Sequence, residues 1–323
     1  MSQRLKFRVA LIALFAPFAL PLAPLLAQEA ATAATTAPAT TQAAAAGETR
    51  FLRFVGDGKS GGRLETSDVT FKNDAGVSVR LVSAVHIGES SYFQEIQKSF
   101  AGCDAVLYEM VKDKDAPPPV KGQQSDHAVA RLQRFLKETL NLSYQLDEID
   151  YTPRNFVHAD MDAAEFERLR SERGESFPAM MLQAMMRSMS DPGAMRAYAD
   201  EPADVMDLMT RPDGESQIKL LLARRLGDIE REASGMDMLN GTVILTERNK
   251  AVTRVLKETL KQGKRNVAIF YGAAHMEELA DRLDLMGFHP VSTDWRPAWN
   301  VRIRQDAPSA FMKLMGQVEK QLK

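Results

Sequence analysis

The chain has 323 residues, of which 45% are hydrophobic and 26% are charged, an ordinary balance for a globular protein. Cys103 is its single cysteine, so an intrachain disulfide is excluded. The formal net charge is −2, and a weakly acidic chain gives no electrostatic argument for binding nucleic acid. We therefore expect no nucleic-acid partner.

The N-terminus has the pattern of an export signal. Its basic residues are Arg4, Lys6 and Arg8. An apolar run interrupted by prolines follows, and Ala27 is a plausible cleavage position, so the pattern predicts a signal peptide over residues 1–27. An uncleaved membrane anchor is the alternative, which the prolines and the short span disfavour. Cleavage would remove the three basic residues and leave 38 basic against 43 acidic residues, a net charge of −5. We expect a periplasmic or secreted protein without membrane contact beyond the signal peptide.

The next segment, residues 28–49, consists almost entirely of Ala, Thr, Gln and Pro. Such a composition buries little apolar surface and predicts a disordered linker. We therefore expect the folded domain to occupy residues 50–323.

The folded region begins with strand-like runs. The expected strands are residues 51–55, 65–72, 77–85 and 105–108. Between the last two, Phe93, Ile96 and Phe100 have helical spacing, with Ser90 or Ser91 as the expected N-cap. Residues 77–111 thus predict a strand–helix–strand unit, the seed of a parallel sheet.

The middle of the chain predicts a mostly helical insertion or cap over about residues 112–240. Apolar spacing marks one helix near residues 129–136 and another near residues 218–229. Met181, Met185 and Met189 form a stripe between them, which is either core or an adaptable apolar binding groove.

The end of the chain returns to alternating strands and helices. The expected elements are a helix at 252–259, a strand at 266–271, a helix at 279–286, strands at 288–293 and 299–303, and a helix at 310–322. The predicted fold class is α/β, with a mixed, partly parallel central sheet flanked by helices.

Two short stretches share a pattern, Ser83-Ala84-Val85-His86 and Gly272-Ala273-Ala274-His275. Each follows a strand-like run and leads into an amphipathic helix, where open α/β sheets place their ligand crevices. Taken alone, a histidine at either place is more often structural than a ligand. If the two meet, they form one site.

Two charged residues fall where the pattern predicts burial. Glu109 lies within the apolar run from Ala105 to Val111, so it is either paired or metal-bound in a buried strand, or solvated because the strand ends at Tyr108. Arg248 lies on the apolar face of its helix and cannot lose its charge, so it needs a carboxylate or an anionic ligand. Glu109 is a candidate partner, and both a structural ion pair and a substrate anchor remain open.

His86, Glu109 and His275 together make a set of two histidines and one carboxylate. Three such ligands leave coordination positions open for water and substrate, as a catalytic metal site requires. His158 is either a further ligand or a structural residue.

Four segments, in order, resemble the signatures of the TraB/PrgY/GumN family. They are residues 82–88, 104–109, 247–249 and 271–276. The family has two Gly-x-x-His motifs, a glutamate closing a buried strand and an Arg-Asn pair. It is related to the TIKI proteins, metal-dependent proteases of Wnt ligands, and more distantly to erythromycin esterase and ChaN-like proteins.

The resemblance covers about residues 77–290 apart from most of the helical middle. It implies that His86, Glu109, Arg248 and His275 cluster and that a divalent ion such as Zn, Mn or Co binds there. The first motif departs from the family because it begins with Ser83. This would alter the His86 half of the site if glycine is required for close approach.

The leading functional hypothesis is an exported metal-dependent hydrolase, a TIKI-like metallopeptidase by analogy, acting on a peptide or small-molecule substrate. In it, His86 and His275 bind the metal, Glu109 is the third ligand or the general base, and Arg248 orients Glu109 or holds a substrate carboxylate. One alternative is a non-catalytic periplasmic protein that sequesters a peptide or signal ligand. Another is a protein whose function is metal binding itself.

Overall fold

The computed structural model describes residues 51–57, 60–121, 140, 142–175, 208, 210–233 and 242–304. The expected signal peptide, linker, methionine stripe, first insertion helix and C-terminal helix lie outside these residues and stay predictions. In the part of the chain described, no helix combines the length and the apolar character needed to cross a membrane.

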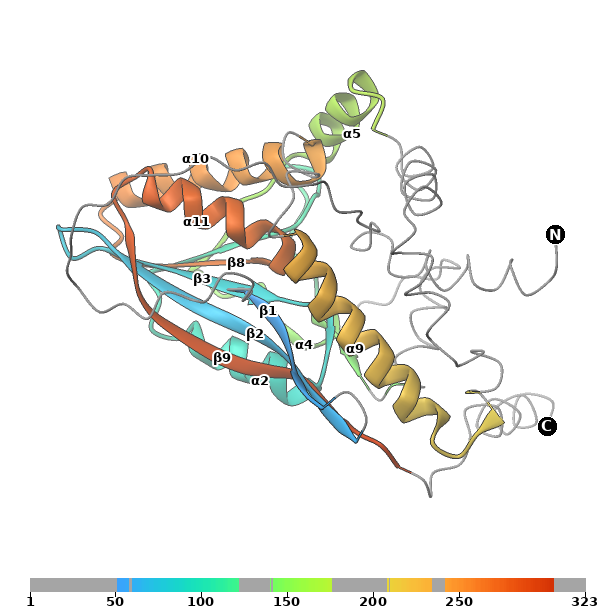
Figure 1. Cartoon of the computed structure of the whole chain (residues 1–323). Helices are drawn as coiled ribbons and strands as arrows, with labels where there is room; N and C mark the ends of the chain where they lie inside the picture. The colour runs from blue at the N-terminus through green and yellow to red at the C-terminus, as the bar shows by residue number, and fades with distance from the viewer. Residues whose placement is uncertain are drawn as a thin grey trace, which may run out of the picture.

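A seven-stranded mixed sheet forms the centre of the described structure (Figure 1). Its strands are β1 (Leu52–Gly56), β2 (Gly61–Lys72), β3 (Ser78–Ala84), β5 (Ala105–Tyr108), β7 (Phe156–His158), β8 (Asn266–Gly272) and β9 (His289–Arg302). The order is β1-β2-β3-β8-β5-β7, with β9 also paired to β2. Strands β3, β8, β5 and β7 are parallel, whereas β1, β3 and β9 are antiparallel to β2. The predicted α/β class with a mixed sheet is confirmed.

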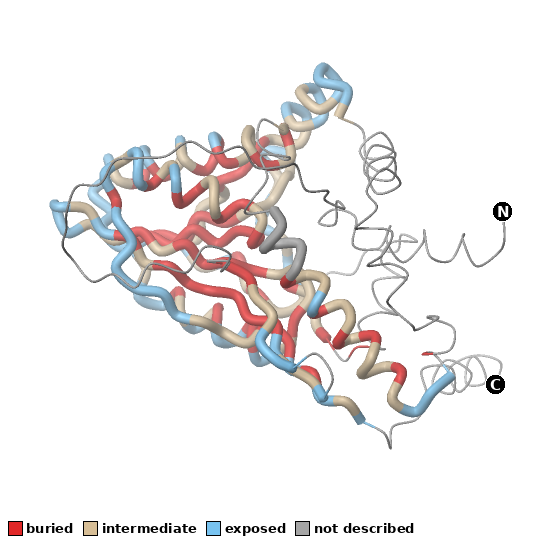
Figure 2. The backbone as a smooth tube through the Cα atoms, viewed as in Figure 1, coloured by how far each residue is buried: buried red, intermediate tan, exposed pale blue. Residues whose placement is uncertain are grey.

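Helices cover both faces of this sheet. Helices α10 (Arg248–Lys261) and α11 (Met276–Asp284) lie on one face, and α2 (Ser90–Ser99) lies on the other (Figure 1). The burial alternates along β3, where Leu81 packs into the core under α10 and α11 and Val82 packs into the core over α2. Figure 2 shows the buried strands enclosed between the two helical layers. Burial on both faces explains why β5 and most of β8 read as continuous apolar runs.

The predicted strand–helix–strand unit forms, but its strands are not neighbours. Strand β8 lies between β3 and β5 and pairs with both in parallel register. The local pattern could not show this, because β8 comes from much later in the chain. The predicted N-cap was wrong: Ser90 begins α2, and Glu89 is the capping residue without a side-chain cap hydrogen bond.

The interval expected to be mostly helical contributes to the main sheet. Its described elements are β6 (Ser143–Tyr144), α4 (Gln145–Glu148), β7, α5 (Ala163–Glu172) and α9 (Gly214–Ala233). Strand β7 pairs with β5, and β6 pairs with the short strand β4 (Ile87–Gly88). Three residues are too few for a period-two pattern to register, so the sequence did not reveal β7.

The two strands expected near the C-terminus are a single strand, β9, which pairs along the whole of β2. The pairing register shifts twice, at Ala298 and at Val291, which directly follow Pro297 and Pro290. Proline cannot donate to a ladder and is tolerated at edges and bulges. The prolines therefore interrupt the pattern in the sequence without ending the strand.

Candidate functional site

Four parallel strands end at the same edge of the sheet, and each is followed by a polar side chain. Glu109 directly follows β5, His86 lies two residues beyond β3, Asp160 two beyond β7, and His275 three beyond β8. The pairings of Ala84 with Gly272 and of Tyr108 with His158 put these strand ends side by side. This carboxyl edge is where open α/β sheets bind ligands.

Glu109 is buried and paired. Its side chain is 9% exposed, and its Oε1 accepts a hydrogen bond from Nη2 of Arg248 at 2.7 Å. Its Oε2 accepts the backbone N–H of Gly272 at 2.6 Å. Burial alone would raise the pKa of Glu109, but Arg248, the two histidines and the Gly272 N–H outweigh it and hold the pKa at about 2. The solvated alternative for Glu109 is thereby set aside.

Arg248 joins two carboxylates at the beginning of α10. The helix continues from the π-helical turn η1 (Val243–Glu247), where the Thr242 hydroxyl accepts the backbone N–H of Leu245. Nε of Arg248 donates to Oδ1 of Asp160 at 2.9 Å, and Nη2 donates to Oδ2 of Asp160 as well as to Glu109. Burial would lower the pKa of Arg248, but the two carboxylates raise it further above its ordinary value. These contacts therefore support the ion-pair role of Arg248.

Asp160 was missed by the sequence analysis. Its side chain is fully buried, and its carboxylate contacts Arg248 and the backbone N–H of Met161. A usable signal existed, because Arg248 required a carboxylate and Asp160 stands between two apolar residues, Ala159 and Met161. The short strand before Asp160 hid it.

His275 is almost completely enclosed. It ends the 3-10 turn η2 (Ala273–His275) and is 2% exposed. Its Nε2 lies 3.5 Å from Oε1 of Glu109, and its Nδ1 hydrogen bonds with Oδ1 of Asn249 at 2.8 Å. Burial lowers the pKa of His275 to about 4, against the opposing effect of Glu109, so the imidazole is neutral at pH 7.

Asn249 links His275 to α11. Asn249 has no exposed surface, and its Nδ2 donates to Oε2 of Glu278 at 2.9 Å. Glu278 also accepts hydrogen bonds from Thr246 and Arg282. Apart from Asn249, which belongs to the Arg-Asn pair of the resemblance, sequence reasoning did not single out these residues.

His86 lies beside the cluster and is half-buried. A Cβ atom on Gly272 would stand 3.9 Å from Nε2 of His86 and 3.3 Å from Oε2 of Glu109. The absence of a side chain at Gly272 thus permits Glu109 to reach the Gly272 backbone, with His86 close by. Its φ of −59° is ordinary, so the requirement for glycine there is space rather than conformation.

The departure at Ser83 has a structural explanation. The Ser83 hydroxyl donates to the backbone carbonyl of Phe51 at 3.0 Å, and Ser83 is fully buried. Ser83 pairs with Tyr271 while Ala84 pairs with Gly272, so the two histidine motifs are offset by one residue on adjacent strands. The hydroxyl secures the chain just before β1.

His158 is not part of the cluster. Its Nε2 donates to the carbonyl of Met110 at 2.6 Å, and its ring packs at 5.7 Å from that of Tyr108. In the described regions, no contact joins it to Glu109 or His275. These contacts favour the structural interpretation of His158.

The donor set fits a divalent cation in kind. Two imidazoles and a carboxylate are ligands that Zn²⁺ accepts, and His275 is already neutral. Glu109 and Asp160 both pair with Arg248, so among these three groups two carboxylates share one guanidinium. Within the described ranges, however, no three His, Cys, Asp or Glu side chains stand as a ready-made metal site.

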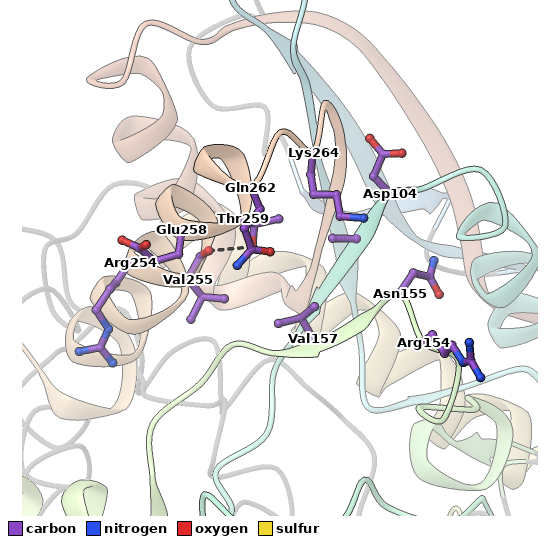
Figure 3. A pocket seen from close by; sticks show the side chains of 11 residues that line it. Asp104, Arg154, Asn155, Val157, Arg254, Val255, Glu258, Thr259, Gln262 and Lys264 are labelled. Carbon is purple, nitrogen blue, oxygen red and sulfur yellow. Dashed lines mark hydrogen bonds between the residues drawn. The ribbon is translucent and has the colours of Figure 1, made fainter.

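A cleft of about 350 Å³ lies at the other edge of the sheet (Figure 3). Its lining includes Asp104, Arg154, Asn155, Arg254, Glu258 and Lys264. Asp104 precedes β5 and Lys264 precedes β8, so the cleft adjoins the amino ends of the parallel strands. The side chains of the buried cluster do not line it.

Comparison with protein-family models, with curated proteins and with solved structures found no match. The resemblance to the TraB/PrgY/GumN family therefore stays a prediction carried by four short motifs.

Proposed function

We propose that the chain is an exported metal-dependent hydrolase that acts on peptides. The observation that carries this proposal is the buried cluster at the carboxyl edge of the sheet, where two carboxylates share one guanidinium beside His275. An excess negative charge away from water is costly unless a cation compensates it. A divalent ion is the cation for which imidazole and carboxylate donors are suited.

His86, Glu109 and His275 would hold the ion. When bound, it would act as a Lewis acid towards a carbonyl oxygen and lower the pKa of a bound water. Glu109 stays ionised through the physiological range because its pKa is about 2. A general base works best with a pKa near the operating pH, so this environment favours the ligand role of Glu109 over the base role.

Arg248 would orient the carboxylate of Glu109. Its Nη2 fixes Oε1, and the Gly272 N–H fixes Oε2, so the carboxylate plane is set from both sides. Asp160 in turn holds the guanidinium through Nε and Nη2. Such contacts around a ligand typically orient it and tune its metal affinity. The choice of a peptide substrate rests on the resemblance to TIKI proteins and is analogy.

A second function is favoured by one observation. Both oxygens of Glu109 already accept hydrogen bonds, and the described side chains do not form a ready-made metal site. A non-catalytic protein that sequesters a peptide or signal ligand in the same crevice would need no metal. Its ligand binding would survive EDTA and would be accompanied by no turnover.

Metal analysis and peptide turnover test the proposal. The purified full chain is titrated with Zn²⁺ and with Mn²⁺ by calorimetry, and hydrolysis of a mixed peptide library is followed by mass spectrometry with and without EDTA. We expect one ion per chain, cleavage that EDTA abolishes, and loss of both in His86→Ala and His275→Ala. His289→Ala is the matched control, because His289 is exposed and pairs only with Asp284 among the described residues. If neither ion binds and EDTA changes no activity, the proposal is wrong.

A further inference from the structure

A chain of polar contacts runs from α11 to the centre of the cluster. Nε of Arg282 donates to Oε1 of Glu278 at 3.0 Å. Oε2 of Glu278 accepts from Nδ2 of Asn249 at 2.9 Å and from the Thr246 hydroxyl at 3.1 Å. Asn249 then meets Nδ1 of His275 through Oδ1, at 2.8 Å. Each polar side-chain atom of Glu278 and of Asn249 thus makes a hydrogen bond along this path.

The contacts determine which way the Asn249 amide faces. An ionised Glu278 can only accept hydrogen bonds, so the group of Asn249 that faces it must be the NH2. The carbonyl oxygen Oδ1 of Asn249 is then left facing His275. Because an amide oxygen only accepts, Nδ1 of His275 must carry the proton.

The orientation of Asn249 has a consequence at the other ring nitrogen. A neutral imidazole with its proton on Nδ1 has a lone pair on Nε2. In this structure Nε2 lies 3.5 Å from Oε1 of Glu109, which is also a hydrogen-bond acceptor. Without Asn249, the tautomer with the proton on Nε2 would become the more stable one, because its Nε2–H could donate to the Glu109 carboxylate. Asn249 and Glu109 therefore favour opposite tautomers of His275.

We propose that Asn249, oriented by the Glu278–Arg282 ion pair, is a positioning residue that holds His275 in the Nδ1–H tautomer. The importance of this tautomer rests on the proposed function, because only an unprotonated Nε2 can bind a cation. The tautomer itself is a property of the metal-free protein. The positioning role of Asn249 and the proposed metal site can therefore be disproved separately.

The test reads the tautomer directly. Long-range ¹⁵N–¹H NMR spectra of the metal-free full chain distinguish protonated from unprotonated ring nitrogens, and His275→Gln identifies the signals of His275. We expect protonated Nδ1 and unprotonated Nε2 in the wild type. Asn249→Ala should transfer the proton to Nε2. Glu278→Gln, which preserves the side-chain volume, should give a mixture because a glutamine can accept from or donate to Asn249.

A matched control separates positioning from stability. Thr259 is a buried polar residue of the same helix, and its hydroxyl donates only to the Val255 carbonyl among described partners, so Thr259→Ala should leave the tautomer unchanged. Zn²⁺ affinity, measured by calorimetry, should fall about 10- to 100-fold in Asn249→Ala, the usual effect of removing a partner of a metal-binding histidine.

Each outcome of these experiments supports or overturns the positioning role of Asn249. Should Asn249→Ala fail to fold, Glu278→Gln alone carries the test. A wild-type His275 with its proton on Nε2, or a tautomer unchanged in both variants, overturns the inference. If the tautomer shifts as expected but no variant and no wild-type sample binds Zn²⁺, the positioning role stands and the proposed metal site fails.

Discussion

Nε2 of His275 lies 3.5 Å from Oε1 of Glu109, and the two residues follow neighbouring parallel strands, β8 and β5. The same Glu109 oxygen accepts a hydrogen bond from Arg248, which holds Asp160 on its other side. The ends of β5 and β8 and the beginning of α10 therefore meet at one carboxylate, and Arg248 links Asp160 to it. The cluster is a set of charges that compensate one another, so the loss of one member should affect the others.

Replacing Arg248 by methionine should destabilise the protein strongly. The variant retains an unbranched side chain without the guanidinium, so Glu109 and Asp160 stay buried without their shared cation. Breaking a buried ion pair in this way typically costs about 3–5 kcal/mol. Urea unfolding followed by circular dichroism measures the change in the free energy of unfolding.

Two further variants control for this result. Arg168→Met removes an exposed pair with Glu172 and should cost at most about 1 kcal/mol. Adding Asp160→Asn to Arg248→Met removes one of the uncompensated charges and should recover part of the loss. Equal losses in Arg168→Met and Arg248→Met would contradict the mutual dependence of the cluster.

Replacing Gly272 by alanine should weaken cation binding more than it weakens the fold. The new Cβ would lie 3.3 Å from Oε2 of Glu109, so the carboxylate must shift by a few tenths of an ångström. We expect a fall of about tenfold in Zn²⁺ affinity, at the low end of the effect of disturbing a ligand's supporting contacts. Gly102→Ala is the control, because a Cβ there meets nothing within 4 Å. An unchanged affinity in Gly272→Ala would mean that Glu109 does not bind the ion.

Much of this fold was predictable because its signals are local. The buried runs of β5 and β8, and the helices before and after β8, have the periodicity that burial on one or both faces imposes. The features that the sequence did not predict depend on pairing between strands that are distant in the chain. That β8 inserts between β3 and β5, and that β7 extends the sheet, is set by strands far apart in the sequence.

The candidate site follows the same division. Glu109 and Arg248 could be singled out because a charge in an apolar pattern needs a partner, and the structure pairs them. Glu278 could not, because it is ordinary in its own segment and becomes distinctive only through its contact with Asn249. Asp160 carried a weaker signal, a carboxylate between two apolar residues, and its contact with Arg248 makes it distinctive. The sequence also marked Ser83 as a departure from the motif, whereas its hydroxyl has a partner 32 residues away, the Phe51 carbonyl.

Replacing Ser83 by glycine, the residue expected from the family pattern, should reduce stability without improving the site. The variant loses the buried hydrogen bond to the Phe51 carbonyl, which still accepts the Ser67 N–H, so we expect a cost of about 0.5–1.5 kcal/mol. Zn²⁺ affinity should be unchanged within twofold. Thermal unfolding and calorimetric titration measure the two quantities. A gain in affinity would instead show that Ser83 limits the His86 half of the site.

Asp104 lies far from the cluster, and replacing it by alanine should make the free energy of unfolding less dependent on pH. Oδ2 of Asp104 accepts the backbone N–H groups of Arg265 and Asn266 at 2.8 and 2.9 Å, joining the beginnings of β5 and β8. These hydrogen bonds lower the pKa of Asp104 below its ordinary value. The folded state therefore binds the proton more weakly than the unfolded state, whose value is about 3.9.

The sign of the pH effect follows from this difference. A lowered pKa in the folded state contributes stability that is complete above the unfolded pKa and is lost as the pH falls through the folded pKa. The wild type should thus exceed Asp104→Ala in urea midpoint most at pH 7, and the gap should narrow below about pH 4, near the unfolded value. Asp115→Ala, at an exposed position, should show no such gap. A gap that stays constant down to pH 2.5 would show that side-chain packing, rather than the charge, explains the contribution of Asp104. Because Asp104 lies at the amino edge of the strands, Zn²⁺ affinity should be the same in all three proteins.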